Sequence, residues 1–207
     1  MNRGVLHMAA VRSRQARADL GGCLRIAAAH RTGSLITVPW ALLPGAAGRP
    51  VTVAPSASSW HAARARRPEP PGDSTRVLLV AGPGNERGVP EVQQIAAMSR
   101  AATVLTDAAA TPAAALAALP TADLAHLAAH GHHQSDNALF SGLELTGGPL
   151  MGYDLHLLAR TAPMVVLSSC DLGLHDVRPG DESLGMVSAL LGAGTSTVVA
   201  SVCRVAD

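Results

Sequence analysis

Residues 122–131 read ADLAHLAAHG, and residues 163–173 read PMVVLSSCDLG. Each stretch begins with an apolar run that is typical of a strand buried on both faces of a parallel sheet. The first run leads into His130 and the second leads into Cys170. Catalytic groups in such sheets gather at the carboxyl ends of the strands. We therefore predict that this histidine and this cysteine meet at one edge of a sheet.

The rest of the chain supports an α/β fold, because predicted strands and helices alternate. Strands are predicted at 34–40, 51–54, 76–81, 103–106, 122–129, 164–169 and 195–202; helices at 91–101, 112–119, 153–160 and from Asp181 to Gly192; and a hairpin over 139–150. The helix over 91–101 is assigned an apolar stripe that includes Met98. We expect a mostly parallel sheet covered by helices on both faces.

The length of 207 residues suits one domain, and 48% hydrophobic residues suffice for a core. Residues 1 to about 31 show no clean periodicity, so we treat 1–33 as a poorly defined segment and 34–207 as the domain. Within it, residues 64–73 (RARRPEPPGD) are predicted to be a solvated loop because three prolines interrupt them. A nucleic-acid-binding patch is the weaker interpretation of this run, since no aromatic residue lies beside it.

Charge and targeting patterns narrow the function further. The net charge of +1 gives no electrostatic reason to bind nucleic acid or an anionic membrane. We find no secretory signal and no apolar run long enough to span a bilayer, so a cytoplasmic location is expected. Three cysteines indicate neither a disulfide framework nor a zinc knuckle. All basic residues are arginine, a bias that suggests a GC-rich bacterial source.

The predicted pair has the composition of a cysteine-peptidase dyad. A thiol needs a nearby base to become a thiolate at neutral pH, and an imidazole supplies one. Gly131 has no side chain, so its backbone N–H can approach a substrate carbonyl and act as an oxyanion donor together with the N–H of Cys170. His130 and Cys170 are therefore our catalytic candidates, and no cofactor or metal is required.

The stretch from residue 122 to the end resembles a CHAT domain, a branch of the caspase/separase-like clan CD cysteine peptidases. The residues that carry the resemblance are 122–131 (ADLAHLAAHG), 137–143 (NALFSGL), 148–150 (GPL), 165–171 (VVLSSCD), 180–185 (GDESLG) and 198–202 (VVASV), with weaker matches at 38–44 and 54–57. The resemblance implies a caspase-like α/β sandwich in which His130 is the general base and Cys170 the nucleophile. It also implies a protein or peptide substrate and a regulatory partner in a repeat-containing protein.

CHAT domains usually continue with helical sequence after the strand that here ends at residues 202–207, so we expect the domain to be incomplete at its C-terminus. A catalytically inactive CHAT module that acts in protein–protein interaction therefore stays open as the alternative. A nucleotide-binding domain built on Gly82–Gly84 is disfavoured, because the full glycine fingerprint and a P-loop lysine are missing.

Other polar residues near the two strands have simpler interpretations. His126 is expected to be a packed strand residue. The group His130, His132 and His133 could suggest zinc, but three ligands within four residues give poor tetrahedral geometry. Asp171 is kept as a candidate for the substrate pocket, whereas Asp181 is expected to cap a helix whose first turn contains Glu182.

Overall fold

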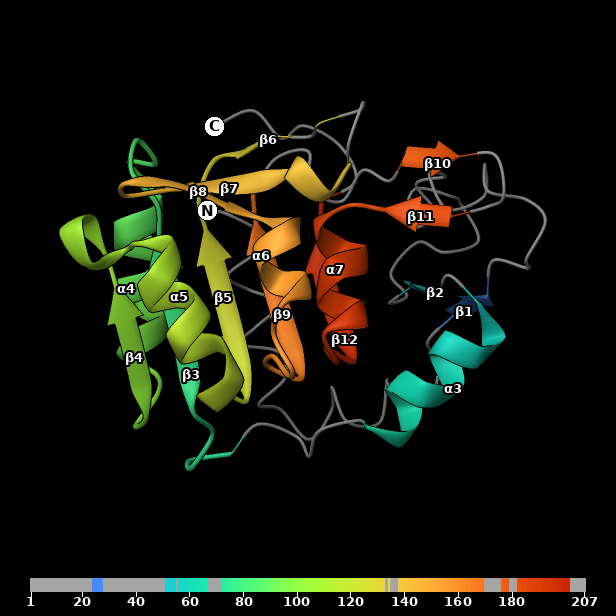
Figure 1. The fold of residues 1–207 in the computed structure, drawn as a ribbon. Helices are drawn as coiled ribbons and strands as arrows, with labels where there is room; N and C mark the ends of the chain where they lie inside the picture. Colours follow the sequence, from blue (N-terminus) through green and yellow to red (C-terminus); the bar gives the residue numbers. More distant parts are fainter. Residues whose placement is uncertain are drawn as a thin grey trace.

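The structure, a computed structural model, describes residues 24–27, 51–54, 56–66, 72–132, 134, 138–169, 176–178 and 182–201 (Figure 1). Its strands are β1 (Leu24–Ala27), β2 (Val51–Ala54), β3 (Val77–Ala81), β4 (Ala102–Leu105), β5 (Leu124–Ala128), β6 (Gly131–His132), β7 (Gly142–Leu145), β8 (Gly148–Met151), β9 (Met164–Ser168), β10 (Asp176–Arg178), β11 (Glu182–Leu184) and β12 (Thr197–Ala200). Its helices are α3 (Ala57–Ala65), α4 (Gly88–Ala96), α5 (Pro112–Ala118), α6 (Gly152–His156) and α7 (Met186–Gly192), with 3₁₀ turns η5 (Asp107–Ala109), η6 (Leu119–Thr121) and η7 (Ala138–Phe140).

The centre of the described chain is a five-stranded sheet in the order β12-β9-β5-β3-β4. All its strand pairs are parallel. The two strands that decided the sequence argument are neighbours, and their register pairs Ala128 with Ser168. The predicted α/β class, with a mostly parallel sheet flanked by helices, is confirmed and is consistent with a caspase-like sandwich.

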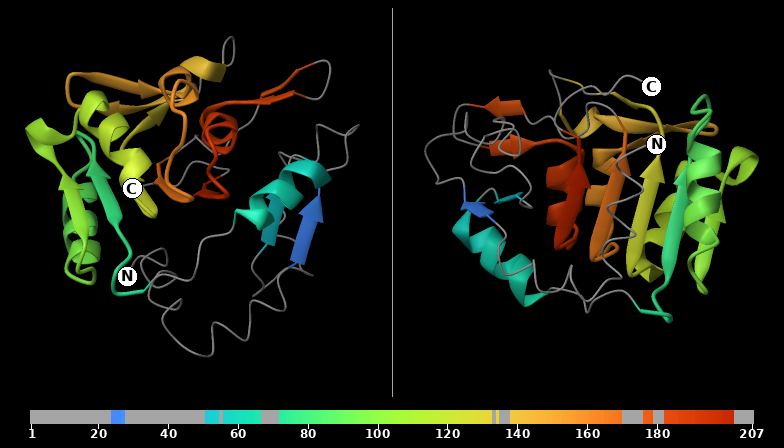
Figure 2. Two further views of the ribbon diagram at one scale, coloured as in Figure 1. Left: turned by 60° about the horizontal axis from the view of Figure 1, so that its bottom comes forward. Right: turned by 180° about the vertical axis from the view of Figure 1, so that it is seen from behind.

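Successive side chains along each strand point to opposite faces of this sheet. We call the side covered by α5, α6 and α7 the front face (Figure 1) and the side covered by α4 the back face (Figure 2). The front face carries Leu78, Leu127 and Leu167, which are almost wholly buried in the larger apolar cluster. The smaller back cluster joins Leu79, Ala81 and Ala128 of the sheet to Val92 and Ile95 of α4. Both clusters use aliphatic side chains, as a sequence with 2% aromatics requires.

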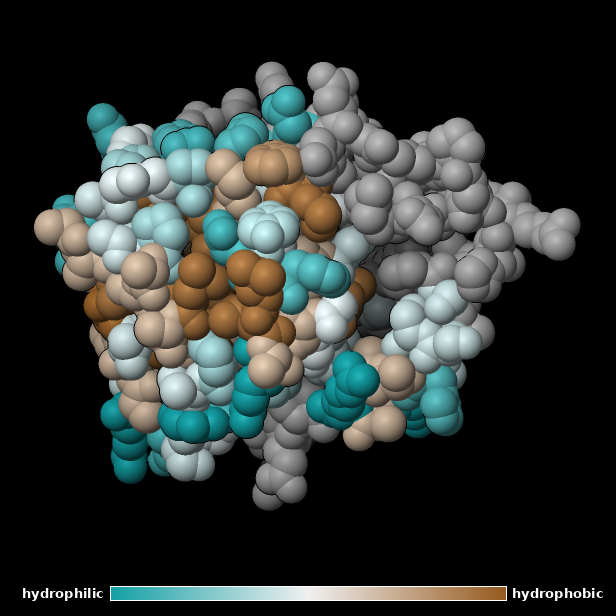
Figure 3. Space-filling view, viewed as in Figure 1, coloured by the Kyte–Doolittle hydropathy of each residue, from teal (hydrophilic) through white to brown (hydrophobic). Residues whose placement is uncertain are grey.

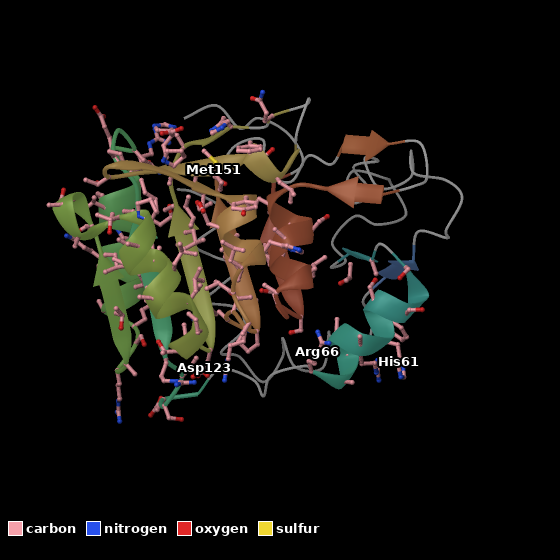
Figure 4. The ribbon with its side chains drawn as sticks, viewed as in Figure 1. His61, Arg66, Asp123 and Met151 are labelled. Atoms are coloured by element: carbon pink, nitrogen blue, oxygen red, sulfur yellow. The ribbon has the colours of Figure 1, made fainter. Side chains whose placement is uncertain are left out.

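A three-stranded antiparallel sheet, β6-β7-β8, lies across the carboxyl ends of the central strands (Figure 1). The turn between β7 and β8 contains Gly147 with φ +88°, a conformation that glycine adopts without strain. Asp123, directly before β5, and Met151, at the end of β8, lie toward opposite ends of the central strands (Figure 4). The predicted hairpin over 139–150 is confirmed, and it forms a roof over the strand ends.

The first described segments form a second, two-stranded sheet with one helix. β1 pairs with β2 in parallel, and α3 packs beside β2 (Figure 2). Helix α3 begins with a capping box in which Ser56 and Ser59 exchange hydrogen bonds with each other's backbone. Strand β1 was not predicted, since residues 1–31 show no clean periodicity, and α3 extends into the predicted 64–73 loop through Ala65. The strand predicted over 34–40 lies outside the described residues.

Two predicted helices have different limits. Helix α4 begins at Gly88 rather than 91, because Pro90 fits the first turn of a helix, where no backbone donor is needed. It ends at Ala96, so Met98 is not part of an apolar helical stripe and is 42% exposed. Helix α6 ends at His156, four residues before the predicted limit.

The prediction that Asp181 caps the last helix was wrong. Helix α7 begins at Met186, and its N-cap is Gly185, with φ +139°. Glu182 is not in a helical turn either, because Glu182–Leu184 is extended and pairs antiparallel with Asp176–Arg178. Asp181 itself lies outside the described residues.

Apolar side chains also reach the surface of the face seen in Figure 3, over α5 and α6. Tyr153 on α6 and Leu157 directly after that helix are 50% and 68% exposed. None of the helices in the described part of the chain is long and apolar enough to cross a membrane.

Candidate active site

His130 stands at the carboxyl end of β5, under the β6-β7-β8 roof. Its backbone is fixed from above, because Glu144 N–H donates to the His130 carbonyl at 2.8 Å. Its side chain is exposed, whereas residues 124–129 before it are buried. The imidazole of His130 is therefore accessible to solvent, while its backbone is held in place by the buried strand and by Glu144.

The His130 ring is held by the turn that follows β3. Its Nε2 lies 3.0 Å from the carbonyl oxygen of Gly84. A carbonyl oxygen only accepts hydrogen bonds, so Nε2 must carry the ring proton in this arrangement. The neutral imidazole then has its lone pair on Nδ1. This contact selects the tautomer in which Nδ1 can act as a base.

The β3–α4 turn reaches His130 because two of its residues are glycines. A Cβ on Gly82 would lie 2.3 Å from the Glu144 carbonyl oxygen and 2.6 Å from the Ala129 Cβ, so no side chain fits there. Gly84 has φ +73°, which strains other residues. The sequence marked Gly82–Gly84 as a turn, but nothing in it predicted the bond to His130.

Asn85 lies three residues before the start of α4. Its side-chain oxygen accepts from the Gly88 N–H at 2.9 Å, at the start of α4. The turn is thus held at both ends, since the Gly82 N–H also donates to the Ala128 carbonyl at 2.9 Å. The Gly84 carbonyl is thereby presented to the histidine by a braced loop.

Gly131, the residue after His130, pairs with Leu143 in the antiparallel sheet. Paired residues in such a ladder alternate between exchanging two hydrogen bonds and exchanging none. Because Glu144 N–H donates to the His130 carbonyl, the Gly131–Leu143 pair is of the second kind. The N–H of Gly131 is therefore directed away from β7.

Cys170 and Asp171, the other two predicted site residues, lie outside the described residues, as do Cys23, Cys203 and His133. Ala128 of β5 and Ser168 of β9 are strand partners. In the sequence, His130 comes two residues after Ala128, and Cys170 comes two residues after Ser168.

Sequence reasoning missed a polar cluster on the back face below His130. His126, only 4% exposed, has Nε2 at 3.1 Å from Oε1 of Glu91 on α4. This contact is electrostatic, because neither ring nitrogen makes a well-aligned hydrogen bond with any of the described residues. Ser168 Oγ donates to the same carboxylate at 3.3 and 3.4 Å. His126 is a packed strand residue as predicted, but its partner is charged.

The pKa of the Glu91 carboxyl is lowered by the contact with His126, and further by the Ser168 hydroxyl. Partial burial of Glu91 acts in the opposite direction. The carboxylate is also in the first turn of α4, where the helix dipole favours negative charge. These effects keep Glu91 ionised at neutral pH.

The His132 side chain lies near an acidic residue of the β6-β7-β8 sheet. Its Nδ1 lies 3.3 Å from Oε1 of Glu144, and both side chains are partly exposed. Within the described residues, no three His, Cys, Asp or Glu side chains are grouped so that they could hold a metal ion.

Comparison with known proteins agrees with this architecture. Residues 10–207 match the family model of the CHAT domain. No curated protein matches the chain. The CHAT family is related to the caspase-like peptidases, and the match covers nearly the whole sequence. The chain therefore belongs to the CHAT domain family.

Proposed function

We propose that this protein is a cysteine endopeptidase of the CHAT type that cleaves a protein substrate with the dyad His130 and Cys170. The observation that carries the proposal is the hydrogen bond between His130 Nε2 and the Gly84 carbonyl. It leaves Nδ1 of an exposed imidazole as a base at the carboxyl edge of the sheet. Membership of a family related to caspase-like peptidases supports the same chemistry.

In the proposed reaction, His130 Nδ1 takes the thiol proton of Cys170, and the thiolate attacks a peptide carbonyl carbon. The backbone N–H groups of Gly131 and Cys170 stabilise the oxyanion. Collapse of this intermediate breaks the C–N bond, and the imidazolium returns its proton to the leaving amine. Water, deprotonated by His130, then hydrolyses the thioester and restores the thiol.

Two features of the described residues support these roles. The Gly131 N–H is directed away from β7, so it can serve a substrate oxygen. The Gly84 carbonyl lies close to the Nε2 proton, so it stabilises the imidazolium that forms when Cys170 is deprotonated. We assign Asp171 to the substrate pocket, and we propose no cofactor. A repeat-containing partner would regulate the site, and the cytoplasm is the proposed compartment.

The test is the pH dependence of alkylation at each cysteine, read by mass spectrometry in the intact protein. We expect Cys170 to react rapidly well below the free-thiol pKa of about 8.5. Cys23 and Cys203 are internal controls in the same chain. His130→Ala should abolish the rapid reaction, whereas His132→Ala, two residues along, should leave it unchanged.

Equal rates at all three cysteines would refute the dyad and favour a catalytically inactive CHAT module that binds partners. Loss of rapid labelling in both histidine variants would show only that the roof is needed. Loss in His130→Ala alone would justify a search for the protein substrate.

A further inference from the structure

Glu91 bridges the two strands that lead into the proposed dyad. Its carboxylate approaches His126 in the middle of β5 and Ser168 at the end of β9. His130 follows His126 by four residues, and Cys170 follows Ser168 by two. The Glu91 side chain on α4 therefore contacts both of the strands that lead into the proposed dyad.

The same segment also supports the histidine ring. Gly84, whose carbonyl is bonded to His130, lies in the turn that leads into α4. Glu91 is in the first turn of that helix. If α4 shifted along the back face, the Gly84 carbonyl that contacts His130 and the Glu91 carboxylate that accepts from Ser168 would therefore move together.

Stability alone does not account for this cluster. The ladder bonds of β5 and β9 already join the two strands. A carboxylate that is partly removed from water is often no better for stability than an apolar replacement of similar volume, because its desolvation cost offsets its attraction to its neighbours. His126 is almost fully buried and Glu91 side-chain exposure is 22%, so this cost applies here. The contacts of Glu91 can instead hold the ends of β5 and β9 in a fixed alignment.

We propose that Glu91 is a positioning residue of the dyad: its contacts with His126 and Ser168 hold the β3–α4 turn and the ends of β5 and β9 in the alignment that the reaction between His130 and Cys170 requires. This inference rests on the proposed function. Glu91 touches neither the substrate nor the reacting atoms, so it acts only through the residues that it holds.

The experiment compares Glu91→Gln and Ser168→Ala with the unaltered protein. The first variant keeps the shape of the side chain and removes its charge, and the second removes one of the two contacts. The matched control is Ser169→Ala, because Ser169 is adjacent in sequence and its buried Oγ has no hydrogen-bond partner among the described residues. The readouts are the pH profile of Cys170 alkylation and the midpoint of thermal unfolding.

We expect Glu91→Gln to slow Cys170 alkylation at neutral pH by about tenfold and to move the profile to higher pH, since small misplacements of reacting groups are costly. Ser168→Ala should do the same to a smaller extent. Ser169→Ala should leave the profile unchanged. A merely structural role for Glu91 would lower the unfolding midpoint and leave the profile of the folded protein where it was.

The two possible failures are distinguishable. If the unaltered protein shows no rapid Cys170 labelling, the proposed function and this inference both fall. If rapid labelling is present and Glu91→Gln keeps the same profile, only the positioning role is overturned. If Glu91→Gln does not fold, Ser168→Ala decides, and an unchanged profile in that variant overturns the inference.

Discussion

The two faces of the central sheet bury different chemistry. The front face packs aliphatic side chains against α5, α6 and α7 in one large cluster. The back face has a smaller aliphatic cluster under α4, and beside it the contact of Glu91 with His126 and Ser168. We infer that the front face supplies most of the stability, whereas the back face positions the strand ends near His130.

Leu127→Ala should give the largest loss of stability, because Leu127 is 1% exposed in the front cluster. We expect the free energy of unfolding to fall by about 3 kcal/mol, through lost burial and a residual cavity. Denaturant unfolding measures this change. Leu157→Ala is the control, since a side chain that is 68% exposed should change stability by less than about 0.5 kcal/mol.

The comparison predicts that Leu127→Ala leaves the pH profile of Cys170 alkylation unaltered in the folded protein. A shifted profile would contradict the division of labour between the faces. It would mean that front-face packing also determines the alignment of the strand ends.

Gly82→Ala tests the close approach of the β3–α4 turn to the β6-β7-β8 sheet. The added methyl would overlap the Glu144 carbonyl and the Ala129 side chain, so the backbone must shift. We expect a loss of about 2 kcal/mol, as is typical of overpacking. Gly72→Ala is the matched control, because no atom of the described residues lies within 4 Å of the position that its Cβ would take. Equal effects of the two changes would show that the close approach is not needed.

Glu91→Gln should change how stability depends on pH. The pKa of Glu91 is lowered in the folded protein, so its stabilisation is complete above the ordinary carboxyl pKa of 4.5 and is lost as the pH falls through the folded value. The difference in unfolding free energy between the two proteins should be about 1 kcal/mol at pH 7 and should shrink in acid. Parallel curves down to the acid transition would contradict an ionised Glu91.

Asp123→Asn should have the smallest effect. Asp123 accepts from the backbone and guanidinium of Arg76, and the side-chain hydrogen bond to Arg76 is the main cause that lowers its pKa from 3.8 to about 2. This stabilisation is therefore present above pH 3.8 and is lost as the pH falls toward 2. Because the pair is exposed, the unfolding midpoint should fall by only about 1–2 °C, and less in high salt.

A larger effect of Asp123→Asn that persists in high salt would contradict this view of the amino end of β5. It would place an important polar contact far from His130 and would weaken the contrast between the faces.

The sequence allowed the sheet and its roof to be predicted because their signals are local. Apolar runs such as 164–168 indicate buried strands, and Thr111 followed by Pro112 marks the start of α5, where Thr111 accepts from the Ala114 N–H as expected. The limits of α7 could not be predicted in the same way. The segment Glu182–Leu184 adopts an extended form through antiparallel pairing with the nearby residues 176–178, which the helix-capping pattern at 181–192 does not indicate.

The site was predictable only in part. His130 was identified from its place after an apolar strand. The Gly84 carbonyl and Glu91 were not, because they lie 46 residues before His130 and 77 before Ser168 respectively, and only the packing of α4 and its turn brings them near. No pattern of residue types marks a backbone carbonyl as the partner of an imidazole.

The most direct test of this account is the position of the ring proton on His130, read by nitrogen-15 NMR of the histidine side chains above their pKa. The account predicts that neutral His130 carries its proton on Nε2, bonded to the Gly84 carbonyl, with a bare Nδ1. A neutral His130 with its proton on Nδ1 would contradict the account, because that nitrogen could not take the proton of Cys170.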